Sequence, residues 1–288
     1  MNKLDEIYDN YHSNNMQYNK EEWAEYKKEE KREVYDLINT TAEKIVTSEN
    51  EFRKYLDSQS NFEYYSVGNA LLVTAQMPEA KQLKDFDSWK NIGVYLKKQP
   101  VAVKILEPAE NYMREDGSIG TNYKVKNVYD VTQVNSRQRI TPMKYDNKIL
   151  VKAFLNSSLS KIKIVDEIPE CDKGAFYDSN ENLLYVARGA SAPKIFHELT
   201  QELAKQQIGE ETSMENFKKY CVSYMLCKKY NIDVSDYDVK IPQELQGMGA
   251  KEIREELEIV RNAMENINSR VTTVIREFIQ NKKNLQER

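Results

Sequence analysis

The chain has 288 residues, of which 31% are charged and 40% are hydrophobic, so it can bury a core beneath a hydrated surface. This length fits about two domains of ordinary size. The 9 glycines and 7 prolines are about half the usual number, which favours a helix-rich chain with few loops. The net charge of −4 excludes a globally basic, histone-like nucleic-acid binder but allows a local basic groove.

The sequence also limits where the protein can reside. No apolar run approaches the roughly 18–20 residues of a membrane span, and the N-terminal MNKLDEIYDN lacks the apolar region of a signal peptide. The three cysteines, Cys171, Cys221 and Cys227, form no CxxC pair, which argues against a disulfide framework or a thiolate zinc cluster. We therefore expect a cytoplasmic protein that does not contact a membrane.

The first sixty residues predict helices. The run Lys20–Lys44 is dense in good helix formers, contains no glycine or proline, and mixes opposite charges as a solvated helix face does. Ser48 is the expected N-cap of a second helix that runs through Leu56, with Glu51 closing a capping box. We assign residues 1–47 to an N-terminal helical segment and begin the first domain at residue 48.

Residues 48–136 predict a small α+β domain. Ser66–Pro78 is a short apolar helix that carries the polar residues Asn69 and Gln76. Asp85–Gly93 reads as a helical turn with Trp89 inside it. Two alternating strands, joined through an Asp-Gly turn, form one long hairpin; they are Val101–Pro108 and Asn122–Val134.

These residues resemble a known domain. The run Ser66–Pro78, followed by Trp89, Gly93, Leu96–Pro108 and the strand Tyr129–Thr132, is similar to the N-terminal domain of ArdC-type antirestriction proteins, in particular the LtrC-like versions on conjugative elements of Gram-positive bacteria. That domain binds single-stranded DNA. The resemblance implies a binding site made of polar, aromatic and basic side chains: Tyr65, Asn69, Gln76, Trp89, Lys97, Lys98 and Lys104.

One departure concerns the turn after the paired lysines. The family has a glycine-rich turn there, whereas this chain has Gln99-Pro100-Val101-Ala102, so a close approach of the backbone to phosphate is in question. Single-strand binding needs aromatic faces and cations. The aromatic candidates are Tyr64, Tyr65, Trp89, Tyr95, Tyr112 and Tyr123; the cationic candidates are Lys97, Lys98, Lys104, Lys124 and Lys126.

The charge balance of this domain leaves an alternative open. Residues 51–130 hold 11 basic and 11 acidic residues, so the lysines bind DNA only if the fold gathers them on one face. Taken residue by residue, Trp89 and most of the tyrosines could equally be core residues.

After a linker at residues 137–149, residues 150–240 predict a second domain in the order helix, strand, hairpin, helix. The hairpin is Gly174–Gly189, and the next helix, Ser191–Gln207, opens at Ser191 with Pro193 in its first turn. A further amphipathic helix spans Met214–Tyr230.

The helix Ser191–Gln207 contains HELTQ, which departs from the zinc-binding motif HExxH. HExxH places two imidazoles one turn apart to hold zinc, and its Glu acts as base on the metal-bound water. Here His197 and Glu198 match, but Gln201 stands at the second imidazole position. The only other histidine, His12, lies in the remote N-terminal segment.

ArdC-type proteins pair the DNA-binding domain with a zincin-like metallopeptidase domain, and the resemblance extends to it. The family's third ligand is an acidic residue on the next helix, where this chain has Lys218–Tyr220 without a carboxylate. We expect a degenerate zincin-like domain with no zinc and no catalytic residue, in which His197, Glu198 and Gln201 are a remnant. Two alternatives stay open: an active zinc metallopeptidase with a non-standard ligand set, and an accidental HELTQ string on an ordinary helix.

In the C-terminal segment 241–288, residues 249–288 predict a helix with a broad apolar stripe, which we expect to pack on the rest of the chain rather than bind a partner. The whole sequence is thus that of a helix-rich, two-domain α+β chain. The function it favours is that of a single-stranded DNA-binding, antirestriction-like accessory protein of a conjugative element, with conjugation proteins as further partners. The competing reading is a protein-interaction scaffold that does not bind DNA.

Overall fold

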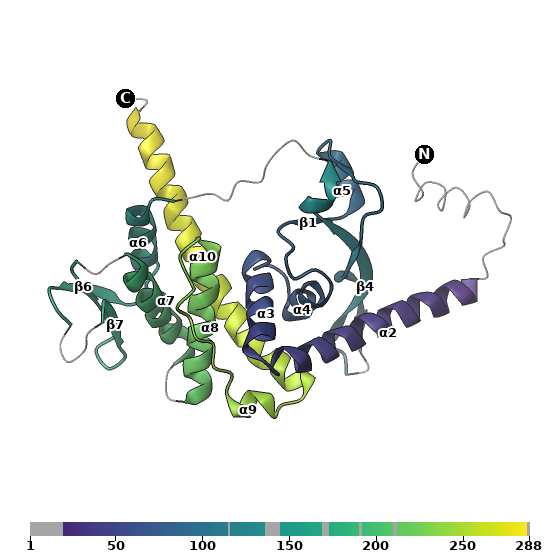
Figure 1. The fold of residues 1–288 in the computed structure, drawn as a ribbon, viewed down its shortest axis with the longest axis horizontal. Coiled ribbons are helices and arrows are strands. Elements are labelled where there is room, and N and C mark those ends of the chain that lie inside the picture. The colour runs from purple at the N-terminus through teal and green to yellow at the C-terminus, as the bar shows by residue number, and fades with distance from the viewer. Residues whose placement is uncertain are drawn as a thin grey trace. The chain divides into compact units, whose positions relative to one another are not determined.

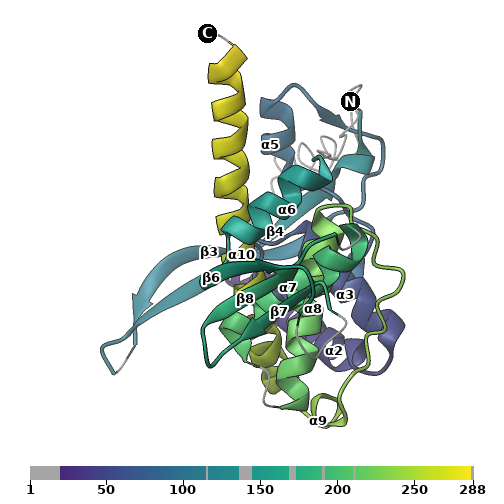
Figure 2. The ribbon, with the colours of Figure 1, turned by 90° about the vertical axis from the view of Figure 1, so that its left-hand side faces the viewer.

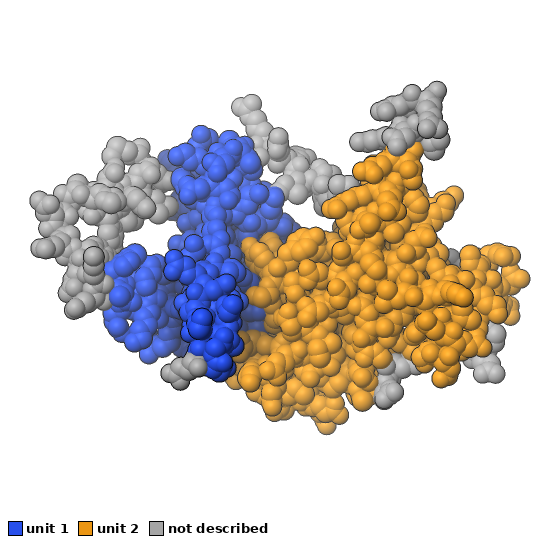
Figure 3. All heavy atoms as spheres, turned by 180° about the vertical axis from the view of Figure 1, so that it is seen from behind, with its two compact units in different colours: residues 1–41, 68–140 blue, residues 42–67, 141–288 orange. Residues whose placement is uncertain are grey.

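The computed structural model describes residues 20–114, 116–135, 145–168, 173–189, 192–209 and 212–286. Several residues named above lie outside the described residues: Ser191, where the HELTQ helix is predicted to open, His12, Cys171 and most of the 137–149 linker. The chain divides into two units, which Figure 3 colours separately: unit 1 comprises Met1–Thr41 and Gly68–Ile140, and unit 2 comprises Ala42–Val67 and Thr141–Arg288.

The first two predicted helices are confirmed. Helix α2 spans Lys20–Ile45 and α3 spans Glu49–Asn61. The Ser48 hydroxyl caps α3 by accepting the N–H of Glu51 at 3.3 Å, which satisfies one of the unpaired donors at the helix start. The Glu51 carboxylate forms ion pairs with Lys44 and Lys54.

Unit 1 is built on the predicted hairpin (Figure 1). Strand β3 (Val103–Met113) pairs antiparallel with β4 (Ile119–Asp130), and β1 (Leu83–Lys84) adds to β4, so the strand order is β1-β4-β3. Gly117 takes the positive φ that the predicted Asp-Gly turn requires. The remaining elements are short: α4 (Val67–Gln76), α5 (Phe86–Asn91), β2 (Tyr95–Leu96), a 3-10 turn (Val131–Gln133) and β5 (Val134–Asn135).

Helix α4 lies along β3, the edge strand, and pairs with its main chain through two side-chain amides. The Asn69 amide donates to the Leu106 carbonyl and accepts the Leu106 N–H, both at 2.8 Å. The Gln76 amide does the same with Lys104, both at 2.9 Å. Because β3 has no strand on this side, the two amides supply the hydrogen bonds that a neighbouring strand would otherwise provide.

We predict that Asn69→Ala lowers the free energy of unfolding of unit 1 by about 1–3 kcal/mol, because it leaves the Leu106 N–H and C=O without partners. Urea unfolding followed by Trp89 fluorescence in a Trp23→Phe background measures this unit, since both tryptophans belong to it. Asn91→Ala, at an exposed position on α5, is the matched control. An Asn69→Ala loss no larger than that of the control would show that the amide pairing contributes nothing to stability.

Unit 2 joins a second sheet to a layer of helices (Figure 2). Strand β6 (Lys161–Val165) runs parallel to β8 (Leu183–Ala187), and β7 (Ala175–Asp178) runs antiparallel to β8, giving the order β6-β8-β7. The predicted hairpin and the predicted helices are confirmed. These helices are α6 (Asn147–Asn156), α7 (Ala192–Ile208), α8 (Ser213–Lys229) and α10 (Ala250–Gln286). A further short helix, α9 (Gln243–Gln246), is not among the predicted elements.

The boundary between the units differs from the predicted one, because α3 contributes to the core of unit 2. Its residues Phe52, Tyr55 and Leu56 are fully buried, and the Phe52 ring lies 5.2 Å from that of Phe217 on α8. Residues 42–67 therefore belong with the second unit rather than with the predicted first domain, 48–136.

The apolar stripe of α10 is buried over most of its length, which confirms that this helix packs within its own chain. The buried positions follow helical spacing: Ile253, Leu257, Val260, Met264, Ile267, Val271 and Ile275. Among the described residues, no helix combines the length and the hydropathy that a membrane crossing requires.

Candidate nucleic-acid interface and HELTQ helix

Trp89, a predicted stacking residue, is a core residue of unit 1. Its side chain is only 3% exposed and packs in a cluster with Tyr129 and Val134. The indole N–H donates to the Tyr129 carbonyl at 2.9 Å. The ring therefore fixes α5 against β4, and its buried faces cannot stack on a base without opening the cluster.

Unlike the buried Trp89, Tyr95 on strand β2 has an exposed aromatic ring. Val94 and Leu96 pack against the Trp89 cluster. Because alternate residues of a strand point to opposite sides, Tyr95 projects away from this cluster, and Lys97 directly follows the strand. The Tyr95 side chain is 58% exposed, and Lys97 and its neighbour Lys98 are also exposed.

The turn after the paired lysines keeps a conformation that glycine favours, although it contains no glycine. Gln99 has φ 55°, in the left-handed region that residues with a Cβ rarely adopt. Gln133 holds both ends of this turn. Its carbonyl accepts the Lys97 N–H at 2.8 Å, while its amide accepts the Val101 N–H at 2.6 Å and donates to the Val101 carbonyl at 2.9 Å.

Four other predicted DNA-binding residues have structural partners. The amides of Asn69 and Gln76 are engaged by β3, as described above. Lys104 forms an ion pair of 3.2 Å with the buried Glu30. Tyr65 belongs to unit 2 and stacks on Phe62, with ring centroids 5.2 Å apart.

The candidate lysines of unit 1 differ in whether they form ion pairs. Lys124 lies 3.1 Å from Glu107, and Lys126 lies 2.6 Å from Glu107 and 2.7 Å from Asp85. Lys97 and Lys98 form no ion pair within the described part of the chain. The Lys97 ammonium donates to the Thr132 carbonyl at 2.7 Å and has two further N–H groups. Among the five lysines named as cationic candidates, Lys97 and Lys98 are thus the two whose charge is not paired with a carboxylate.

Two features of this surface leave no signal in the sequence. The apolar side chains of Ile92 and Val101 are exposed beside β2, and Gln133 holds the turn. Exposed apolar residues between short elements had no periodic signal that could identify them. The structural role of Gln133 depends on the approach of residues about 30 positions away along the chain.

The salt bridge at the start of α5 predicts an acid-dependent loss of stability. Asp85 caps α5 by accepting the Ser88 N–H at 2.6 Å, and the Lys126 ammonium and this cap lower the pKa of its carboxyl to about 2. Because an unfolded Asp titrates near 3.9, this stabilisation is present above about pH 4 and is lost as the pH falls through 2. Asp85→Asn retains a good N-cap and should flatten the decline in unfolding free energy over this range.

Measuring the urea unfolding free energy of unit 1 at several pH values tests this, with Asp87→Asn, at an exposed position in the same helix, as control. A wild-type decline that persists unchanged in Asp85→Asn would contradict the assignment.

The HELTQ residues lie on α7 in unit 2, where His197 has a protein partner. The His197 Nε2 atom lies 2.6 Å from the carbonyl oxygen of Asp233, and the edge of its ring packs on Tyr237 with centroids 4.6 Å apart. A carbonyl oxygen can only accept, so Nε2 carries the proton in this arrangement and has no lone pair to offer a metal.

Two glutamates of α7 bind main-chain N–H groups at the antiparallel edge strand β7 and at the residue just before it. The Glu198 carboxylate accepts the Gly174 N–H. One turn later, Glu202 accepts the Tyr177 N–H at 3.0 Å, and the buried Lys205 donates to the Tyr177 carbonyl at 2.8 Å. Glu198 thus has a structural role at the position where the zinc motif places its catalytic base.

Hydroxyl and aromatic groups fill the space beside His197. Thr200, Ser223 and Tyr237 form a buried chain, with oxygen–oxygen distances of 2.6 Å and 2.5 Å. Cys227 lies against the same group, and burial raises the pKa of its thiol to about 11. None of these groups is a carboxylate or an imidazole.

Side chains of Lys218–Tyr220, the stretch expected to carry a third ligand, also interact with other parts of the protein. Lys218 forms an ion pair with Glu256 on α10, and the Tyr220 hydroxyl accepts the Asp238 N–H at 2.8 Å. The Gln201 amide has no hydrogen-bond partner among the described residues, which also contain no group of three or more His, Cys, Asp or Glu side chains able to hold a metal. Among the described residues, HELTQ thus supplies one imidazole and one carboxylate, and both already have main-chain partners.

Comparison with known proteins identifies the class of fold. No protein-family model matches the chain. An uncharacterized protein of Bacillus anthracis is 23% identical over 304 residues, covering 86% of this chain and 51% of the relative, so the chain spans about half the length of that curated protein. The fold is that of the antirestriction protein ArdC from plasmid R388, whose crystal structure superposes with a TM-score of 0.55 and 15% identity over 83% of this chain and 98% of ArdC. The Mn(II)-bound structure of ArdC gives the same TM-score.

Proposed function

We propose that this chain is an ArdC-like antirestriction protein that binds single-stranded DNA through the surface formed by Tyr95, Lys97 and Lys98. The ArdC fold over most of both chains supports the class. The observation that carries the DNA-binding site is the exposure of the Tyr95 ring on β2 directly beside the exposed Lys97 and Lys98, while Val94 and Leu96 pack against the Trp89 cluster.

This surface has the chemistry that single strands require. A base can stack on the exposed Tyr95 ring, and the ammonium groups of Lys97 and Lys98 can neutralise successive phosphates. Gln133 holds the exposed turn that contains Gln99. In this turn Gln99 adopts the left-handed backbone conformation that a glycine would favour. Such contacts read no base edges, so the binding should depend little on sequence.

We predict that Tyr95→Ala weakens binding of an oligothymidine by about tenfold or more, in line with the usual contribution of base stacking. Tyr112→Ala, at an exposed position on the hairpin, should leave binding unchanged. Replacing Lys97 and Lys98 together by Ala should weaken binding and reduce the slope of log affinity against log salt by about 0.7 per lysine. Fluorescence anisotropy with a labelled oligonucleotide at several salt concentrations measures both effects.

Absence of binding even at low salt would overturn the proposed site and favour the interaction scaffold. Binding that resists Tyr95→Ala but falls with Tyr112→Ala would move the interface from β2 to the hairpin.

For unit 2 we propose a zincin-like domain without metal catalysis. Two of the three motif residues form hydrogen bonds within the protein, which supports this proposal: Nε2 of His197 donates to the Asp233 carbonyl, and Glu198 accepts the Gly174 N–H. A catalytic zinc site needs three protein ligands and a water, and Gln201 provides only a neutral amide. Glu198 then has no metal-bound water to deprotonate.

We predict that the purified protein contains much less than one zinc per chain and that Glu198→Gln changes no proteolytic activity. Elemental analysis after purification without added metal measures the zinc content. One tightly bound zinc per chain, lost in His197→Ala but not in the control His12→Ala, would contradict the proposal. That result would reopen the reading of a metallopeptidase with a non-standard ligand set.

A further inference from the structure

The sheet of unit 2 has an edge strand, β6, whose apolar side is left open. The parallel register places Ile162 beside Leu184 and Ile164 beside Val186 on β8. Leu184 and Val186 are 0% and 4% exposed, whereas Ile162 and Ile164 are 38% and 59% exposed. The apolar face of this sheet is therefore buried at β8 but remains exposed to solvent at β6.

The main chain of β6 directs hydrogen-bonding groups outward at the same two residues. The Val165 carbonyl accepts the Arg188 N–H at 2.8 Å, so Val165 faces β8. The direction of the main-chain groups alternates along a strand. The N–H and C=O groups of Lys161 and Lys163 therefore also point toward β8, and those of Ile162 and Ile164 point to the free edge. No group in the described part of the chain bonds to these four outward groups. An edge of this kind is a template for a further strand.

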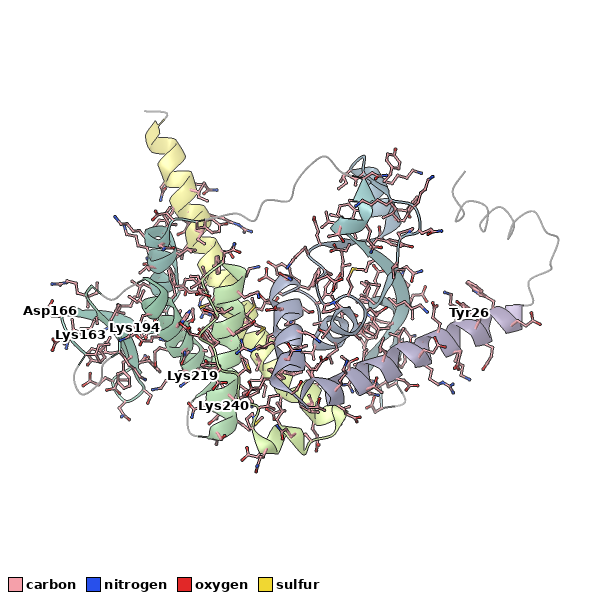
Figure 4. All side chains as sticks on the ribbon, in the orientation of Figure 1. Tyr26, Lys163, Asp166, Lys194, Lys219 and Lys240 are labelled. Atoms are coloured by element: carbon pink, nitrogen blue, oxygen red, sulfur yellow. The ribbon has the colours of Figure 1, made fainter. Side chains whose placement is uncertain are left out.

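The opposite face of β6 is basic. Lys161 and Lys163 are exposed there, and the Lys163 ammonium lies 5.3 Å from the centre of the Tyr185 ring on β8. Arg188 follows β8 and pairs with Asp166 at 3.0 Å. Figure 4 shows Lys163 and Asp166 at the outer margin of unit 2. Acidic side chains directly across from these lysines would be favourable cross-strand neighbours.

We propose that β6 binds an extended segment of a partner protein in which acidic and β-branched apolar side chains alternate, by adding it as a fourth, antiparallel strand. The main-chain groups of Ile162 and Ile164 exchange hydrogen bonds with the segment. Its apolar side chains cover the two isoleucines on one face, and its carboxylates lie across from Lys161 and Lys163 on the other.

The charge of β6 favours such a partner over a second copy of this chain. Pairing of two β6 strands would place the Lys161 and Lys163 of both copies on one face of the joined sheet, where like charges across strands are destabilising. An acidic strand removes this repulsion while covering the same apolar area.

A synthetic peptide of four Glu-Val repeats, labelled with a fluorophore, tests the proposal against a Lys-Val peptide of the same length. The full chain should bind the first peptide and not the second. Ile164→Pro removes the outward N–H without affecting the pairing with β8, since proline is tolerated at the open side of an edge strand. It should weaken binding at least about fivefold, the usual effect of one main-chain hydrogen bond, whereas Ile164→Thr, which keeps the N–H, should have a smaller effect.

Two further measurements distinguish strand addition from non-specific attraction. Lys161→Glu combined with Lys163→Glu should reverse the preference, so that the Lys-Val peptide binds and the Glu-Val peptide does not. Amide hydrogen exchange at Ile162 and Ile164 should slow when the peptide binds, while exchange at Lys163, whose N–H already faces β8, should not change.

Failure to bind the Glu-Val peptide at millimolar concentration, or binding that Ile164→Pro leaves intact, would overturn the proposal. Sedimentation showing a dimer of the chain alone that Ile164→Pro dissociates would assign the edge to a second copy. These outcomes are independent of the DNA titration, because β6 and β2 belong to different units.

Discussion

The hydrogen bonding of edge strands is the constraint on which the rest of the structure depends. In each unit a helix lies along an edge strand and its polar side chains pair with the strand's main chain. Asn69 and Gln76 do this for β3, and Glu202 and Lys205 do it for β7. An unpaired main-chain group that is withdrawn from water costs about as much as a lost hydrogen bond, so these side chains are fixed by the fold. Polar side chains that do not pair with an edge strand are free to contact a ligand.

The HELTQ helix illustrates how this constraint affects the interpretation of a motif. Glu198 and Glu202 are spaced one turn apart, and this spacing lets them accept the N–H of Gly174, just before β7, and the N–H of Tyr177 in β7. The apolar side of α7, with Leu199 and Leu203 fully buried, holds the helix in the core. A helix with these contacts persists whether or not its exposed positions bind a metal. ArdC, whose fold this chain shares, has been crystallised both without metal and with Mn(II).

Elements with a clear period could be predicted from the sequence, whereas the roles of single polar or aromatic residues could not. The helix at Lys20–Ile45 and the two hairpins followed from spacing and turn residues, because those signals are local. The burial of Trp89 and the pairing of Asn69 with Leu106 depend on contacts between residues about 40 positions apart. The place of α3 in unit 2 depends on Phe52 meeting Phe217. Such long-range contacts leave no pattern in the local sequence.

The most direct test of this account is an NMR titration of the backbone amides of the full chain with oligothymidine. The account predicts shifts concentrated at residues 92–101, with Tyr95 and the turn at Gln99 most affected, and unchanged amides at Lys104 and Leu106, whose N–H groups stay bound to α4. Shifts centred on α7 or β6, or loss of the α4–β3 pairing on binding, would contradict it.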